Sequence, residues 1–130
     1  MTSTNKFNST QRNDLEKYNS RINMTRSYIH DKNLRGLLNN QKWLKIFKWI
    51  EKNQITFTLS TLLNPDERNC TFIRELETTS ILIDDTGQFI DFLEISKLAA
   101  PKLKSLIKFL DESNVAYMED NKFLYIVGYQ

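Results

Sequence analysis

One short segment of this sequence carries a residue pattern known from catalysis. The segment 81–90 reads ILIDDTGQFI, so an apolar run is followed by Asp85-Thr86-Gly87. Aspartic proteases present a catalytic carboxylate in this way, and their chemistry needs two carboxylates that share one proton. With one Asp-Thr-Gly in the chain, the second carboxylate would have to come from another copy of the protein. The same letters also describe a tight turn that joins two strands.

The surrounding sequence favours the turn. Ile126-Val127-Gly128 could stand for the apolar-apolar-Gly segment of the retroviral-type proteases. However, Gln88 stands where those enzymes usually have a small residue, and strand-like alternation resumes directly after it. Helical patterns in the N-terminal third and over 101–113 do not suit that fold either. We therefore interpret 85–88 as a hairpin turn with Gly87 at a positive φ.

His30 and Cys70 are the other side chains that could support nucleophilic or metal chemistry. Each is the only residue of its type, so the usual spacing of metal ligands is absent. His30 falls at the end of a helical pattern, where an imidazolium suits the helix dipole. Cys70 has no histidine near it in sequence, and a buried thiol is expected. The three glycines are scattered and form no phosphate-binding loop. We expect no enzymatic activity, no metal and no cofactor.

Charge is distributed unevenly along the chain. Residues 1–53 hold eleven Lys/Arg and four acidic residues, whereas residues 54–130 hold seven and twelve, which together give the net charge of +2. Eight acids fall within 66–94, with only Arg68 and Arg74 among them. If these acids lie on the outer face of a sheet, they are either simply solvated or form a docking surface for a basic protein. The residues predicted for that surface are Glu75, Glu77, Asp84, Asp85, Asp91 and Glu94.

The lysines of the N-terminal half suggest an alternative. A helix over 40–53 would place its lysines opposite its apolar face, where they are either solvated or bind a phosphate backbone. Trp49 lies beside them in projection and could stack a base. The residues of this alternative nucleic-acid-binding surface are Lys42, Lys45, Lys48, Trp49 and Lys52. Near-neutral net charge, and the lack of arginine on this face, make it the less favoured hypothesis.

Composition sets the frame for these surfaces. The 130 residues include 40% hydrophobic and 12% aromatic residues, enough for one hydrophobic core and a single domain over 1–130. No apolar run approaches the roughly 18 residues of a membrane-spanning helix, and the first residues lack the apolar segment of a secretory signal. With one cysteine, no internal disulfide can form. We expect a cytoplasmic protein without membrane association.

Hydrophobic periodicity predicts an α+β fold. The sequence indicates helices over about 11–30, 40–53 and 101–113, and strands at 55–60, 71–76, 81–84, 89–95, 115–118 and 123–129, the last two as a hairpin. The expected architecture is an antiparallel sheet of four to six strands, packed on one face by the helices 40–53 and 101–113. Residues 1–9 are expected to be flexible, and 10–36 to form an N-terminal helical extension.

Three short segments resemble a family of small bacterial proteins of unknown function. The segments are Asn39-Asn40-Gln41-Lys42-Trp43, then Ile90 to Ile95, and then the ending that contains Ile126-Val-Gly-Tyr129. The resemblance would cover about 37–129, with Gln41 in place of the usual Thr. It implies no activity, and the motif residues look structural. In size, α+β pattern and charge, the chain is also loosely similar to the immunity proteins that accompany bacterial toxins. We therefore expect a non-catalytic binding protein, plausibly an immunity protein that occludes a basic toxin.

Overall fold

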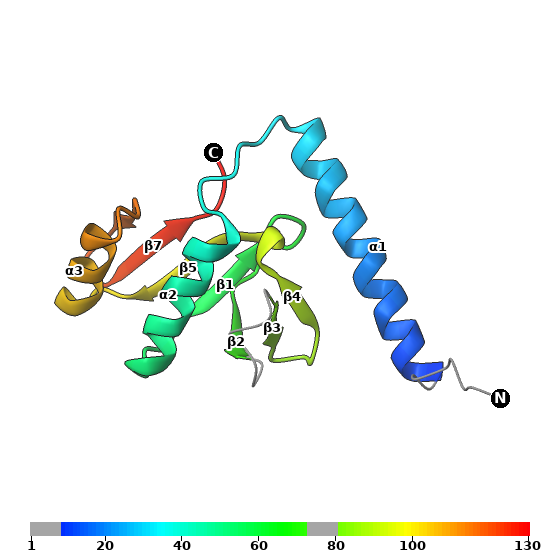
Figure 1. Ribbon diagram of the computed structural model, residues 1–130, viewed down its shortest axis with the longest axis horizontal. Helices are drawn as coiled ribbons and strands as arrows, with labels where there is room; N and C mark the ends of the chain where they lie inside the picture. Colours follow the sequence, from blue (N-terminus) through cyan, green and yellow to red (C-terminus); the bar gives the residue numbers. More distant parts are fainter. Residues whose placement is uncertain (1–8, 73–80) are drawn as a thin grey trace.

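A seven-stranded antiparallel sheet forms the centre of the structure (Figure 1). This computed structural model describes residues 9–72 and 81–130. The strands follow the order β4-β3-β2-β1-β5-β7-β6, and β1 pairs with the distant β5 at the middle of the sheet. The strands are β1 (Thr58–Thr61), β2 (Arg68–Phe72), β3 (Ile81–Asp84), β4 (Phe89–Asp91), β5 (Ile95–Pro101), β6 (Met118–Glu119) and β7 (Phe123–Val127).

The predicted α+β class and antiparallel pairing are confirmed, with more strands than expected. The sheet has seven strands rather than four to six because a 3-10 turn over Phe92–Glu94 interrupts the predicted strand 89–95, and the further strand β5 follows it. The two edge strands are short, with three residues in β4 and two in β6. Such short edges leave few unpaired backbone groups for another strand to join.

Within the described residues, three α-helices accompany the sheet: α1 (Ser9–Asp31), α2 (Asn40–Lys52) and α3 (Lys104–Glu112). A 3-10 turn, η2 (Phe92–Glu94), joins β4 to β5. The third helix starts later than the predicted 101 because Pro101 still pairs with Phe123 of β7, and the Lys102 amide donates to the Lys122 carbonyl. None of the described helices combines the length and apolar character needed to cross a bilayer.

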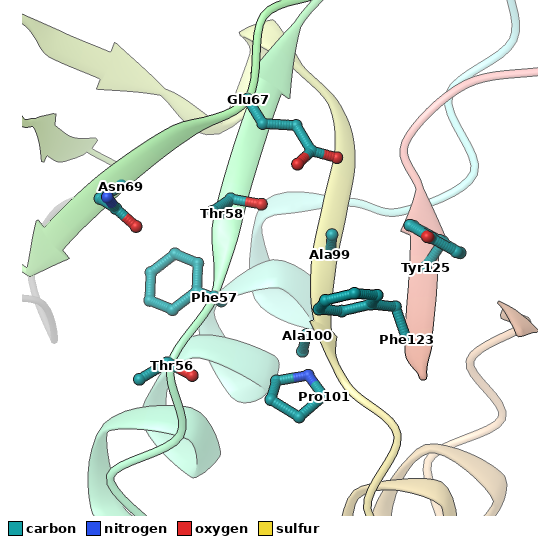
Figure 2. A pocket seen from close by; sticks show the side chains of 10 residues that line it. All are labelled: Thr56, Phe57, Thr58, Glu67, Asn69, Ala99, Ala100, Pro101, Phe123 and Tyr125. Atoms are coloured by element: carbon teal, nitrogen blue, oxygen red, sulfur yellow. The ribbon is translucent and has the colours of Figure 1, made fainter. Parts of the chain in front are cut away.

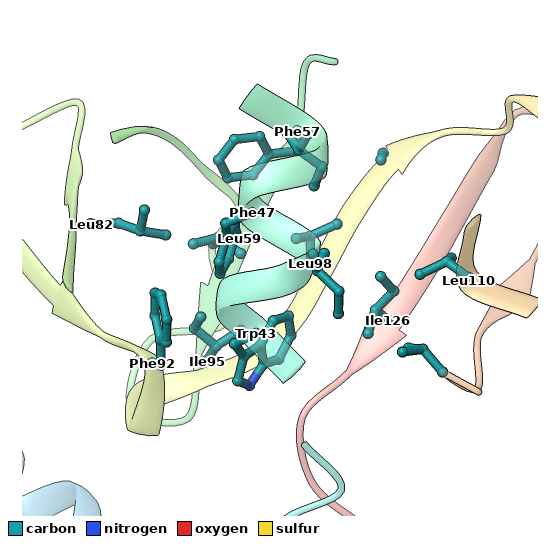
Figure 3. Close-up of a cluster of buried hydrophobic side chains, with 14 of the residues drawn as sticks. Trp43, Phe47, Phe57, Leu59, Leu82, Phe92, Ile95, Leu98, Leu110 and Ile126 are labelled. Carbon is teal, nitrogen blue, oxygen red and sulfur yellow. The ribbon is translucent and has the colours of Figure 1, made fainter. Parts of the chain in front are cut away.

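The hydrophobic core lies between the sheet and helix α2. Asn39 caps α2 by accepting a hydrogen bond from the Lys42 amide, which satisfies one of the amides left open at a helix start. The helix then buries Trp43 and Phe47, whose rings stack with centroids 5.6 Å apart. Figure 3 shows these rings against side chains of the sheet. The apolar spacing of α2 therefore determines which face of the sheet is covered.

The opposite face of the sheet carries no helix among the described residues. Helices α2 and α3 lie on one side, and α1 runs beside β4 (Figure 1). Residues directly paired across strands point to the same side, so Thr58, Ala99 and Tyr125 share the uncovered side. Leu124 and Ile126 alternate with Tyr125 and are fully buried in the core. We call the uncovered side over β1, β5 and β7 the open face.

Candidate functional site

Asp85-Thr86-Gly87 forms the turn between β3 and β4, as the sequence predicts. Gly87 has a φ of 86°, and its amide donates to the carbonyl of Asp84 over 3.0 Å. The side chain that organises the turn is Asp84 rather than Asp85. Its Oδ1 accepts hydrogen bonds from the Thr86 amide at 2.9 Å, the Thr86 hydroxyl at 2.6 Å and the Gln88 amide at 2.9 Å. Asp85 is exposed at the tip of the turn.

Asp84 is a buried structural carboxylate. Asp84 is 4% exposed, and its Oδ2 accepts a hydrogen bond of 3.1 Å from Arg68 Nη1. Burial alone would raise the pKa of Asp84, but the hydrogen bonds from Thr86 and Gln88 and the charge of Arg68 outweigh it, so the pKa lies below its ordinary value. The expectation that Asp84 lies on a solvated face is wrong, because a turn of this kind needs the carboxylate as an acceptor within it.

Glu94 is also buried, inside the joint between β4 and β5. It is 1% exposed, and its Oε1 lies 2.5 Å from Arg21 Nε of helix α1. Its Oε2 accepts the Asp91 amide at 2.9 Å, while Asp91 in turn accepts the Leu93 amide at 2.9 Å. These reciprocal bonds form a capping box at the start of η2. The predicted outward position of Glu94 is wrong because strand alternation ends at this cap.

Asp91 and Arg21 complete a polar clamp between helix α1 and the sheet. The Tyr18 hydroxyl donates to Asp91 Oδ2 over 2.8 Å, and Arg21 Nη2 also donates to the Phe89 carbonyl. Burial of the ring, and then the hydrogen bond to Asp91, raise the pKa of Tyr18. We use the name α1 clamp for Tyr18, Arg21, Asp91 and Glu94. Two acids of the predicted docking surface are thus bound by the protein's own N-terminal helix.

The predicted acidic surface is therefore not displayed as a cluster. Asp84, Asp91 and Glu94 make internal hydrogen bonds, and of the predicted acids in the described ranges only Asp85 is exposed. The other two, Glu75 and Glu77, lie outside the residues that the structure describes.

The predicted basic surface is exposed, but its tryptophan is occupied. Lys45, Lys48 and Lys52 are exposed on the outer side of α2, and Lys42 reaches the Asn114 carbonyl at 3.4 Å. Trp49 packs between the helices, where its ring stacks on Phe109 of α3 at 5.0 Å. One face of the Trp49 ring is therefore occupied by the neighbouring helix, but the residue is half-exposed, so the prediction that it could stack a base stays untested.

The residues with nucleophilic or metal-binding potential lie apart from one another. The side chain of His30 is 91% exposed at the end of α1, with Asp31 3.5 Å away. Cys70 is half-buried in β2, and burial raises the pKa of its thiol to about 11. Within residues 9–72 and 81–130, no three metal-ligating side chains come together.

A shallow hollow of about 290 Å³ lies on the open face (Figure 2). Ala99 and Pro101 of β5 line its middle, Phe123 and Tyr125 of β7 form one wall, and Glu67 stands at its rim. Phe123 remains 44% exposed. None of these residues was predicted as a site, although the alternation of buried Leu124 and Ile126 with exposed neighbours could have indicated an outward aromatic row.

The motifs behind the family resemblance meet at the start of α2 and have structural roles. Trp43 is 2% exposed in the core. A Cβ on Gly128 would overlap the Ile95 carbonyl and reach the Trp43 ring at 3.4 Å, so this position has room only for glycine. The Tyr129 hydroxyl donates to the Leu93 carbonyl over 2.6 Å. These residues hold α2, η2 and the last strand together.

No protein-family model, curated protein or solved structure matches the chain. The family resemblance and the likeness to immunity proteins therefore stay predictions.

Proposed function

We propose that this protein is a non-catalytic binding protein that uses its open face to engage a basic protein. The single observation that carries the proposal is the exposed apolar surface formed by the wall of the hollow and the neighbouring Met118, beside carboxylates. Met118 and Phe123 are 58% and 44% exposed, and Met118 pairs with Tyr125 on the same side of the sheet. Exposed aromatic and methionine side chains around a concave surface are typical of protein interfaces.

Two carboxylates of this surface are the contacts proposed for a basic partner, and each lies beside a lysine of the same chain, Glu67 beside Lys97 and Asp120 beside Lys102. Glu67 stands at the rim with its side chain 48% exposed. Asp120 lies next to Tyr125, and hydrogen bonds from the Phe123 and Lys122 amides lower the pKa of its carboxyl. The Asp120 carboxyl is therefore ionised at neutral pH. Complementary charge raises association rates and fixes orientation.

A toxin with a basic cleft is the kind of partner that this surface would fit. The protein would act by occlusion, with the open face covering the cleft and excluding its substrate. The acids assigned to the contact are Glu67 and Asp120, in place of the buried Asp84 and Glu94. The non-catalytic part of the proposal is supported by the exposure of His30, by the burial that raises the pKa of the Cys70 thiol, and by the structural use of Asp84.

Site-specific photo-crosslinking in the native cells tests this function. A photoreactive phenylalanine analogue replaces Phe123 on the open face, and the matched control carries it at Leu15, which is 45% exposed on α1. We expect one defined protein adduct from position 123 and none from position 15. Adducts at both positions, or at neither, would contradict the proposal. Circular dichroism of both variants establishes that each one folds.

One observation favours nucleic-acid binding as a second candidate. In the described part of the chain, Lys45, Lys48 and Lys52 make no ion pair and share the outer side of α2. Such lysines can neutralise phosphates, and binding would then weaken steeply with salt. Retention on a nucleic-acid column at low ionic strength, lost in a Lys45→Gln/Lys48→Gln variant, would support this candidate. Absence of any salt-sensitive retention would exclude it.

A further inference from the structure

Lys97 of β5 lies on the open face between an aromatic ring and a carboxylate. Its Nζ is 5.3 Å from the centroid of the Tyr125 ring and 3.2 Å from Glu67 Oε1. A cation over a tyrosine face is attracted by the quadrupole of the ring, and the carboxylate adds an ion pair. We call the place defined by Glu67 and Tyr125 the cation seat. The protein's own lysine demonstrates that a side-chain cation fits there.

The Tyr125 ring of the cation seat is held in place through its hydroxyl group. The Tyr125 hydroxyl donates to Asp120 Oδ2 over 2.8 Å. Asp120 Oδ1 is itself fixed by the amides of Lys122 and Phe123 at 2.8 and 2.7 Å. The aromatic face is therefore oriented before any ligand arrives, and this lowers the entropic cost of binding to it.

The Lys97 side chain is only weakly bound at the cation seat. Its side chain is 35% exposed and that of Glu67 is 48% exposed, so water screens the pair and the lysine can leave at little cost. Arginine is a better occupant, because its planar group can bind a carboxylate through two parallel hydrogen bonds and stack on a ring. Ala99, which is paired with Tyr125, adds no bulk, and Phe123 and Pro101 offer apolar surface to an arginine stem (Figure 2).

We propose that the cation seat binds an arginine side chain of the basic protein partner, and that Lys97 is a resident placeholder which this arginine displaces. The inference rests on the proposed function and names the chemistry of the contact. Glu67 supplies the carboxylate, Tyr125 the ring face, and the exposed Phe123 the wall along the arginine stem.

Nuclear magnetic resonance titration with the peptide acetyl-Gly-Arg-Gly-Arg-Gly-amide tests the seat on the full chain. We expect saturable shifts of the Ala99 and Tyr125 amides. Glu67→Gln should raise the dissociation constant about fivefold, because one charge-assisted contact is lost. Lys97→Gln should lower the dissociation constant about threefold, because it removes the lysine that competes for the cation seat. The amide spectrum of each variant also reports whether it is folded.

Two matched controls separate the seat from general electrostatics. Asp85→Asn removes an exposed negative charge at the β3–β4 turn, and Lys108→Gln removes an exposed positive charge on α3. Both should leave the dissociation constant within about twofold of the wild-type value. The inference is overturned if no shifts localise to the cation seat. It is also overturned if Asp85→Asn changes the dissociation constant as much as Glu67→Gln does, and Lys108→Gln as much as Lys97→Gln does. A defined cross-link at position 123 would then still support the proposed function without the arginine contact.

Discussion

Replacing Arg21 with methionine tests the α1 clamp most directly. The methionine keeps much of the aliphatic volume but removes the only cation paired with Glu94 in the described part of the chain. The side chains of Arg21 and Glu94 are 18% and 2% exposed, so this is a buried pair rather than a surface pair. Removing one partner of a buried pair costs about 3–5 kcal/mol, because the other charge stays buried.

We expect a loss of about 3 kcal/mol, at the lower end of that range. Glu94 keeps one acceptor contact, the Asp91 amide at 2.9 Å, which still stabilises its charge. The loss is a large part of the roughly 5–15 kcal/mol that holds a typical protein folded. Urea unfolding followed by tryptophan fluorescence measures it, since Trp43 is in the core and Trp49 packs against Phe109.

A double-mutant cycle with Glu94→Gln isolates the pair from other effects of the substitutions. Glutamine keeps an acceptor for the Asp91 amide and removes the charge, so Arg21→Met should cost much less in that background. We expect a coupling energy of at least about 2 kcal/mol. A coupling below about 0.5 kcal/mol, typical of exposed pairs, would refute the reasoning that the clamp is buried.

Three further predictions follow from single residues. The ionised Asp84 stabilises the fold above the ordinary aspartate pKa of about 3.9, and this stability is lost as pH falls through the lower pKa of the folded state. Asp84→Asn should remove this contribution, so the free energy of unfolding measured with urea should fall less steeply at acidic pH in the variant than in the wild type. Gly128→Ala should destabilise the protein by about 1–3 kcal/mol, because the new methyl group meets the Ile95 carbonyl; an unchanged urea midpoint would contradict this steric argument. Cys70 should react with iodoacetamide at pH 8 far more slowly in the folded than in the urea-unfolded protein, because burial raises its pKa to about 11; equal rates would disprove the burial.

Local patterns in the sequence predicted the elements that depend on neighbouring residues. The Asn39 cap and the spacing of Trp43 and Phe47 define α2, and the predicted helix 40–53 is confirmed over Asn40–Lys52. The Asp-Thr-Gly turn was predictable for the same reason, since a positive φ at Gly87 is a local requirement. These features need no knowledge of the rest of the chain.

The surfaces could not be predicted because contacts between distant residues decide which charges stay free. Arg21 and Glu94 are 73 positions apart, and no periodicity links them. Asp84 and Asp91 follow the alternation of their strands, yet each ends a strand and serves as an acceptor for the bend that follows. A count of acids along the chain cannot distinguish such acceptors from solvated groups such as Glu67.

The position of β1 beside β5 has a consequence for biogenesis. During synthesis, β1 (residues 58–61) cannot pair with β5 until residues 95–101 have been made, and β7 can pair with β5 only after that. The β3–β4 hairpin, in contrast, involves neighbours in sequence and can form as soon as it leaves the ribosome. Pairing that spans a long stretch of chain is slow because of loop-closure entropy. Ribosome-stalled chains ending near 100 should therefore be sensitive to protease at β1, and full-length chains should be resistant there.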